Sequence, residues 1–230
     1  MGNIYKLVAL LVLVYISWNL LNQKNYDEGL AAFRTADYET AFSIFQSTAD
    51  DGNVDAQYSL GHMYRNALYV EQDFSQALKW YTLAAEAEHP IAQNDLGLMC
   101  KNGEGMEVDY SAAMDWFLKS SELDYYGGQF NIGLMFYQGV GVEQDYEQAL
   151  NWYLLAAAQG MTIAQRSLGV MYKLGQGAAI NDNYAYMWLY IAKERGDAPA
   201  SNLIEEYNRE LNSDTITQSI ALANQWLARN

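Results

Sequence analysis

The chain has 230 residues, of which 51% are hydrophobic and only two are prolines, and this composition excludes an intrinsically disordered protein. Acidic residues outnumber basic ones 28 to 13, so the net charge of −15 repels phosphate backbones and argues against nucleic acid as a partner. Ala, Leu, Gln and Glu are common while runs of β-branched residues are rare, which predicts an all-α fold.

The first predicted element is an apolar helix at residues 4–21, within an N-terminal segment 1–24. It holds 18 residues with Lys6 as the one charge, just enough to cross a bilayer core of about 30 Å. Bulky residues occupy the region where a cleavage site needs small ones. We therefore expect a single-pass inner-membrane anchor with the rest of the chain in the periplasm. The alternatives are a cleaved signal peptide, with secretion to the periplasm, and a buried core helix.

From residue 54 onwards the chain repeats itself every 36 residues without an insertion. Four columns show this spacing: Gly61, Gly97, Gly133 and Gly169; Met63, Met99, Met135 and Met171; Ala77, Ala113, Ala149 and Ala185; and Trp80, Trp116, Trp152 and Trp188. Periods of this size are typical of stacked structural units. We therefore divide residues 54–197 into four repeats: 54–89, 90–125, 126–161 and 162–197.

Each repeat is predicted to hold two amphipathic helices, because apolar residues recur at helical spacing in both of its halves. Glycine pairs such as Gly103 and Gly105 favour a turn between the helices, since positive φ angles cost glycine little. Asp73, Asp109 and Asp145 precede the second helix, where a carboxylate caps the N-terminus.

Two turns depart from the pattern. In the first repeat Ala67 and Tyr69 replace the glycines, and in the fourth repeat the aspartate is displaced to Asp182. We expect these two turns to differ in shape, while the helices persist.

Both ends of the repeat array are predicted to be capped. Residues 25–53 form a shorter N-terminal unit, because Asp37 and Ala41 lie 36 residues before Asp73 and Ala77. After Asp197 the repeat stops, and two further helices are expected near residues 199–211 and from Ser213 or Asp214 to about 228. In this C-terminal region, 198–230, they would cover the apolar face of the last repeat.

The repeated motif A-Q-x-x-L-G-x-M-Y, then G-x-G-x-x-x-D-Y, then A-x-x-W-Y-x-x-A-A resembles the Sel-like repeat family, relatives of tetratricopeptide repeats. The resemblance covers about residues 54–197. It implies a right-handed α/α solenoid with terminal capping helices, in which the first helix of each repeat lines the concave surface. It also implies a non-enzymatic scaffold or adaptor that binds another protein, in the cell envelope or its membrane.

Variable positions on the first helix of each repeat are the predicted binding residues, because the shared positions are accounted for by the scaffold. Their i, i+4, i+7 spacing puts each set on one face, along which a partner peptide or helix would lie. The sets are Tyr58, His62 and Arg65; Asn94, Leu98 and Lys101; Phe130, Leu134 and Tyr137; and Arg166, Val170 and Lys173. In the alternative reading, position 62 and its equivalents pack between neighbouring repeats.

No pattern in the sequence predicts catalysis. The chain has two histidines and neither H-E-x-x-H nor C-x-x-C, so we expect no metal, and the G-x-G pairs lack the third glycine of a dinucleotide site, so we expect no cofactor. Cys100 stands where other repeats have Tyr or Phe and is predicted to be a core residue. The rival functions are a periplasmic protein that binds a small ligand such as a cell-wall fragment, an envelope enzyme, and a structural spacer.

Overall fold

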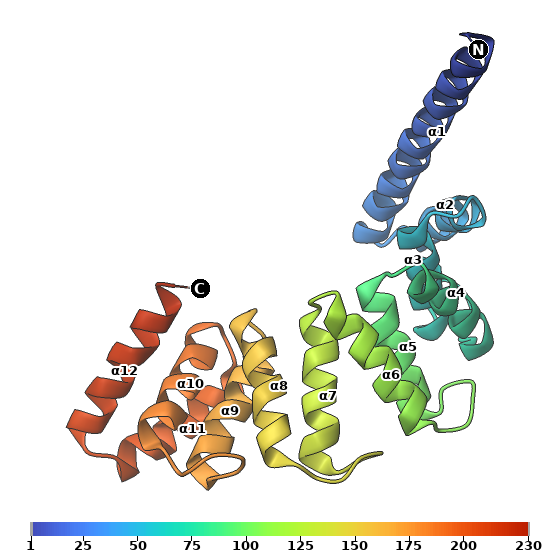
Figure 1. The fold of residues 1–230 in the computed structure, drawn as a ribbon. Helices are drawn as coiled ribbons and strands as arrows, with labels where there is room; N and C mark the ends of the chain where they lie inside the picture. Colours follow the sequence, from blue (N-terminus) through green and yellow to red (C-terminus); the bar gives the residue numbers. More distant parts are fainter. Residues whose placement is uncertain (1, 230) are drawn as a thin grey trace. The chain divides into compact units, whose positions relative to one another are not determined.

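The computed structural model describes residues 2–229, and over this range it contains helices and turns but no strand, which confirms the all-α prediction. The helices fall into two compact units, residues 1–108 and 109–230. Within each unit, most helices that follow one another in the chain pack side by side, as in a solenoid (Figure 1).

The first unit holds α1 (Gly2–Arg34), α2 (Tyr38–Asp50), α3 (Val54–Arg65), α4 (Phe74–Glu86) and α5 (Pro90–Asn102). The second unit holds α6 (Tyr110–Glu122), α7 (Tyr126–Gln138), α8 (Tyr146–Ala158), α9 (Thr162–Leu174), α10 (Asp182–Glu194), α11 (Ala198–Glu210) and α12 (Ser213–Leu227).

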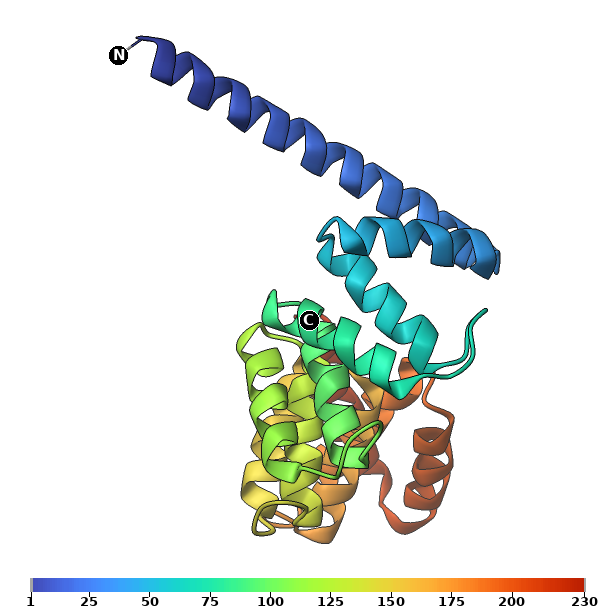
Figure 2. The same cartoon turned by 90° about the vertical axis from the view of Figure 1, so that its right-hand side faces the viewer.

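Helix α1 is one uninterrupted helix of 33 residues whose N-terminal half extends beyond the helices that its C-terminal half packs on (Figures 1 and 2). Gly29 allows the close approach to α2, since a Cβ there would lie 2.8 Å from the ring of Phe45. The side chains from Leu10 to Leu21 are exposed.

The prediction that residues 4–21 contact a membrane is not supported. Among the described residues, none of the helices combines the length and the apolarity that a bilayer span requires. The apolar run of described side chains contains Ser17 and Asn19 and ends at Asn22, and the start of the predicted segment lies outside the described side chains.

The predicted caps are present at the second helix of each repeat. Asp73, Asp109 and Asp145 each accept a backbone N–H from the first turn of the helix that follows, at 2.9–3.0 Å. In the fourth repeat Asn181 takes this place and accepts the N–H of Tyr184 at 3.0 Å, with φ and ψ close to those of the aspartates.

The prediction that two turns differ in shape is wrong. Ala67 and Tyr69 have φ angles of 55° and 71°, beside 71° and 75° for Gly103 and Gly105. The same backbone hydrogen bond closes the turn, from the N–H of Leu68 to the carbonyl of Met63 in the first repeat, at 3.0 Å. The packing of the helices therefore imposes the left-handed conformation even where glycine is missing.

In three of the four repeats, the glutamine of the A-Q motif joins the repeat to the helix before it. A carbonyl near a helix C-terminus has no partner within its own helix, so a side-chain amide that reaches it satisfies a buried acceptor. Three glutamines donate in this way: Gln57 to Ala49, Gln93 to Ala85 and Gln165 to Ala157, at 3.4, 3.0 and 3.0 Å.

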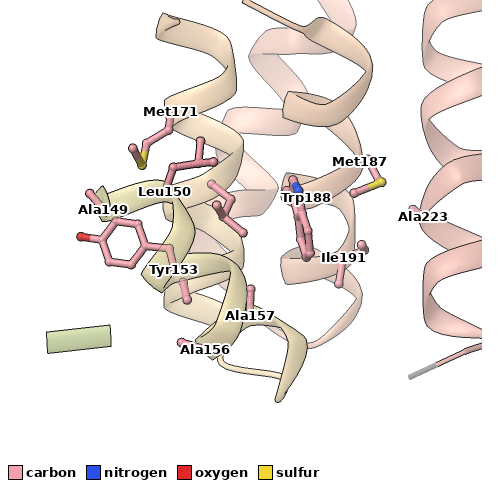
Figure 3. Close-up of a cluster of buried hydrophobic side chains, with 12 residues drawn as sticks. Ala149, Leu150, Tyr153, Ala156, Ala157, Met171, Met187, Trp188, Ile191 and Ala223 are labelled. Carbon is pink, nitrogen blue, oxygen red and sulfur yellow. The ribbon is translucent and has the colours of Figure 1, made fainter. Parts of the chain in front are cut away.

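Small residues where helices cross let large side chains fill the remaining space. A Cβ on Gly133 would lie 2.8 Å from the ring of Tyr153, so α7 and α8 approach as closely as a glycine permits. Figure 3 shows Tyr153 in the core cluster of the second unit, which extends through Trp188 on α10 to Ala223 on α12. Cys100 is buried, as predicted.

The two C-terminal helices lie where the sequence predicts them. Helix α12 packs on α10, and the rings of Trp188 and Trp226 meet edge to face with centroids 5.2 Å apart. Its cap is Asn212, which accepts the N–H of Thr215 at 2.9 Å, rather than the expected Ser213 or Asp214.

Candidate partner-binding surfaces

The predicted binding residues lie on α3, α5, α7 and α9. All are half-buried except Asn94, which is buried. Each half-buried side chain presents part of its surface to solvent.

Five of the predicted residues meet at a groove in the second unit with a volume of about 310 Å³. We call it the second-unit groove, and it is lined by Phe130, Leu134, Tyr137, Gln138, Tyr153, Ile163, Arg166, Ser167, Val170 and Leu203. Four helices, α7, α8, α9 and α11, thus contribute side chains to one hollow.

The second-unit groove is mainly apolar, and the charge at its wall is paired. Arg166 lies 3.2 Å from the carboxylate of Asp197, so the guanidinium is neutralised within the structure. The hydroxyl of Tyr137 donates to the side chain of Gln176 at 3.2 Å, and the ring of Phe130 stacks on Tyr153 with centroids 5.3 Å apart. Burial raises the pKa of Tyr153, which keeps its hydroxyl neutral. Such a surface suits apolar side chains.

In the first unit, Tyr58 and His62 line a different hollow. It has a volume of about 240 Å³, and we call it the aromatic pocket. Its lining comes from α1, α2 and α3 and consists of Tyr26, Leu30, Phe33, Phe45, Tyr58, Ser59 and His62.

A desolvated carboxylate lies next to this pocket. Asp95 on α5 accepts the hydroxyl of Tyr58 at 3.3 Å and the side-chain amide of Asn94 at 3.1 Å. Burial raises the pKa of Asp95, against the opposing effect of Arg65. Burial also lowers the pKa of His62, although Asp95 acts in the other direction.

Two of the other predicted residues are paired elsewhere. Arg65 makes a bidentate ion pair with Glu104, in which Nε and Nη2 donate to the two carboxylate oxygens at 2.7 and 3.1 Å. The ammonium of Lys173 lies 3.1 Å from Glu210 and 4.1 Å from the ring centre of Tyr207. Neither Arg65 nor Lys173 lines the groove or the pocket, and the same holds for Leu98 and Lys101.

Several residues at these surfaces were not predicted, among them Ile163, Leu203 and Asp95. Ile163 and Leu203 lie outside the repeated i, i+4, i+7 positions, and Leu203 belongs to a capping helix. Asp95 had a detectable signal, because the equivalent residues are Ser59, Asn131 and Ser167, so it is the one charged residue of its column.

Among the described residues, no group of three or more His, Cys, Asp and Glu side chains is placed so that it could hold a metal ion. The two hollows are lined mainly by apolar and aromatic side chains.

Comparison with known proteins places these features in a family. The sequence model of the Sel1 repeat matches residues 25–53, 54–89, 90–125, 127–161 and 162–197. A solved Sel1 repeat protein from Oxalobacter formigenes is 29% identical with a TM-score of 0.76, and the match covers 87% of this chain and 84% of that one.

The protective antigen c5321 of uropathogenic Escherichia coli, described as displaying an SLR fold, is 31% identical with a TM-score of 0.78. That match covers 90% of this chain but 46% of the antigen. The immunity protein Pa5087 of Pseudomonas aeruginosa shares the fold at 20% identity, with a TM-score of 0.55 over 90% of this chain and 82% of that one. A comparison with curated proteins gave no match.

Proposed function

Because the chain belongs to the Sel1 repeat family, we propose that it is a non-enzymatic scaffold whose second-unit groove binds apolar side chains of a partner protein. Sel1 repeat proteins mediate protein–protein interactions. The observation that carries the proposal is the convergence of Phe130, Leu134 and Val170 with Ile163 and Leu203 on one hollow.

The chemistry of the groove indicates what the partner presents. Its walls are aliphatic and aromatic, and its guanidinium is already paired with Asp197, so the groove itself favours an uncharged apolar anchor. Acidic residues outnumber basic ones two to one in residues 109–230, so basic residues beside that anchor would gain from the surrounding field. A partner segment with apolar anchors flanked by lysine or arginine fits both properties.

Capture of the partner tests the groove. The full-length chain serves as bait for crosslinked native extracts, beside the variants Phe130→Ala and Ile163→Ser and the control Leu155→Ala. Leu155 is 50% exposed on α8 and does not line the groove, so its loss removes a comparable apolar surface elsewhere. Truncating a good anchor costs about 2 kcal/mol or more, or roughly 30-fold in affinity.

The outcome depends on a difference between variants. Loss of one reproducible partner with both groove variants, and its retention with Leu155→Ala, supports the proposal. Equal capture by all four proteins contradicts it. Circular dichroism melting must accompany the assay, since Phe130 also packs on Tyr153.

The proposal includes a location in the cell envelope, for both the scaffold and its partner. The apolar sequence from Leu7 to Leu21 after Lys6 supports export of the chain. Protease treatment of cells with a permeabilised outer membrane should degrade an exported protein, whereas protection until the inner membrane is broken contradicts this location.

A further inference from the structure

We propose that the aromatic pocket of the first unit takes a cationic side chain, lysine or arginine, from a partner protein. The proposal rests on the proposed scaffold function and adds the chemistry of a second anchor. It follows from three features of the pocket: its walls, the carboxylates around it, and the state of the cations nearby.

The walls are aromatic on several sides. Tyr26 and Phe33 come from α1, Phe45 from α2 and Tyr58 from α3. The ring centroids of Tyr26 and Phe45 are 5.6 Å apart, and those of Phe33 and Phe45 are 6.2 Å apart. Aromatic rings attract a cation near their faces, and the attraction grows when the cation is desolvated. The aliphatic stem of lysine or arginine also packs well on such walls.

Three carboxylates act on the lining residues. Burial raises the pKa of the Tyr26 hydroxyl most, Asp55 and Asp27 raise it further, and Arg34 lowers it by a smaller amount, so both carboxylates lie within electrostatic reach of this wall. On the other side, Asp95 accepts the hydroxyl of Tyr58 and acts on His62. The field in the pocket therefore opposes an anion.

Arg65 lowers the pKa of Asp95 against the larger effect of burial, but it forms no ion pair with this carboxylate. The guanidinium of Arg65 is instead paired with Glu104 at 2.7 Å. His62 has a lowered pKa because of burial and is neutral at pH 7. No ion pair among the described residues includes Asp95. A cation in the pocket would thus gain from a carboxylate that has lost part of its hydration, whereas a neutral side chain of equal shape would not.

A pair of matched probes separates charge from shape. N-acetyl-lysine methylamide and N-acetyl-norleucine methylamide have straight side chains with and without an ammonium group. Saturation-transfer NMR with the full-length chain measures the affinity of each probe. We expect the lysine probe to bind about five-fold more tightly than the norleucine probe, as a cation–π and charge effect of ordinary size.

Three variants test whether the preference for the lysine probe comes from the aromatic pocket. Asp95→Asn keeps the size of the side chain and the acceptor for Tyr58, and should abolish most of the five-fold preference. Phe33→Leu should weaken both probes while leaving the fold intact, as judged by melting. Asp115→Asn, at an exposed position of α6, makes the same change in net charge and should leave the preference unaltered.

Three results would overturn the proposal: no binding of either probe, equal binding of both, or a lysine preference that survives Asp95→Asn. The last would mean that the net charge of −15 attracts the probe without a site. No partner protein is present in this assay, and Asp95 does not line the second-unit groove, so the change in preference caused by Asp95→Asn reports on the aromatic pocket. Failure of the pocket and failure of the groove are therefore distinguishable.

Discussion

Glu88→Gly should stabilise the protein, because Glu88 has a left-handed backbone that glycine adopts without strain. The turn between repeats recurs at residues 52, 88, 124, 160 and 196, with φ angles of 87°, 61°, 56°, 93° and 90°. Gly occupies three of these positions, while Glu88 and Asp124 occupy the other two. The N–H of Glu88 donates to the carbonyl of Ala85 at 3.1 Å, so the conformation is held by the turn itself.

The size of the effect follows from two opposing contributions. A left-handed conformation costs a residue with a Cβ about 1–2 kcal/mol. Replacing the residue by glycine removes this strain. Glycine, however, loses more backbone freedom on folding, and this entropy loss offsets about 0.5–1 kcal/mol of the gain. Glu88→Gly should therefore raise the free energy of unfolding by about 0.5–1 kcal/mol, which corresponds to an increase in Tm of about 1–4 °C for a chain of this size.

Urea and thermal unfolding measure this change, with two companion variants. Gly52→Ala should lower stability by about the same 0.5–1 kcal/mol, since its Cβ would have no atom within 4 Å and the effect is one of the backbone alone. Glu88→Gln removes the charge but keeps the strain, and should change stability little. Destabilisation by Glu88→Gly, or equal gains from Glu88→Gly and Glu88→Gln, would refute the reasoning.

Three further variants test packing and electrostatics. Gly133→Ala places a Cβ 2.8 Å from the buried ring of Tyr153 and should destabilise the protein by about 1–3 kcal/mol in thermal melting; no loss would mean that α7 and α8 can move apart. Arg65→Met leaves Glu104 unpaired in a half-buried site and should cost about 2 kcal/mol in urea unfolding, whereas adding Glu104→Gln should recover part of the loss; additive effects would deny the coupling. Because burial raises the pKa of Asp95, the folded state holds this proton more tightly than the unfolded chain, and stability falls as pH rises through that pKa. Asp95→Asn should thus raise the urea midpoint at pH 7 and change it less near pH 3, and a gain independent of pH would contradict the assignment.

Most of the fold could be predicted because the 36-residue spacing forces equivalent residues into equivalent structures. The caps at Asp73 and Asp145 followed from the same register. The left-handed Ala67 and Tyr69 could not be predicted from local preference, because tertiary packing overrides that preference here.

The candidate surfaces were only partly predictable. The register correctly grouped Phe130 and Tyr137, which share a helix face and a groove. Leu203 reaches that groove from a helix outside the repeats, so no repeat comparison could find it. The pairing of Arg65 with Glu104 depends on where the turn of the next repeat lies in space, which helical spacing does not specify.

The contacts between successive repeats also determine how the protein opens. Gln93 and Gln165 each reach back to the preceding helix, while Arg65 and Tyr137 each reach forward 39 residues to the next turn. A helix with contacts on both sides can unfold only if both sets of contacts break, whereas a terminal helix needs to break the contacts on one side only. Amide hydrogens should therefore exchange fastest at the outer helices of each unit and slowest in its interior, so that opening proceeds by fraying inward from the ends.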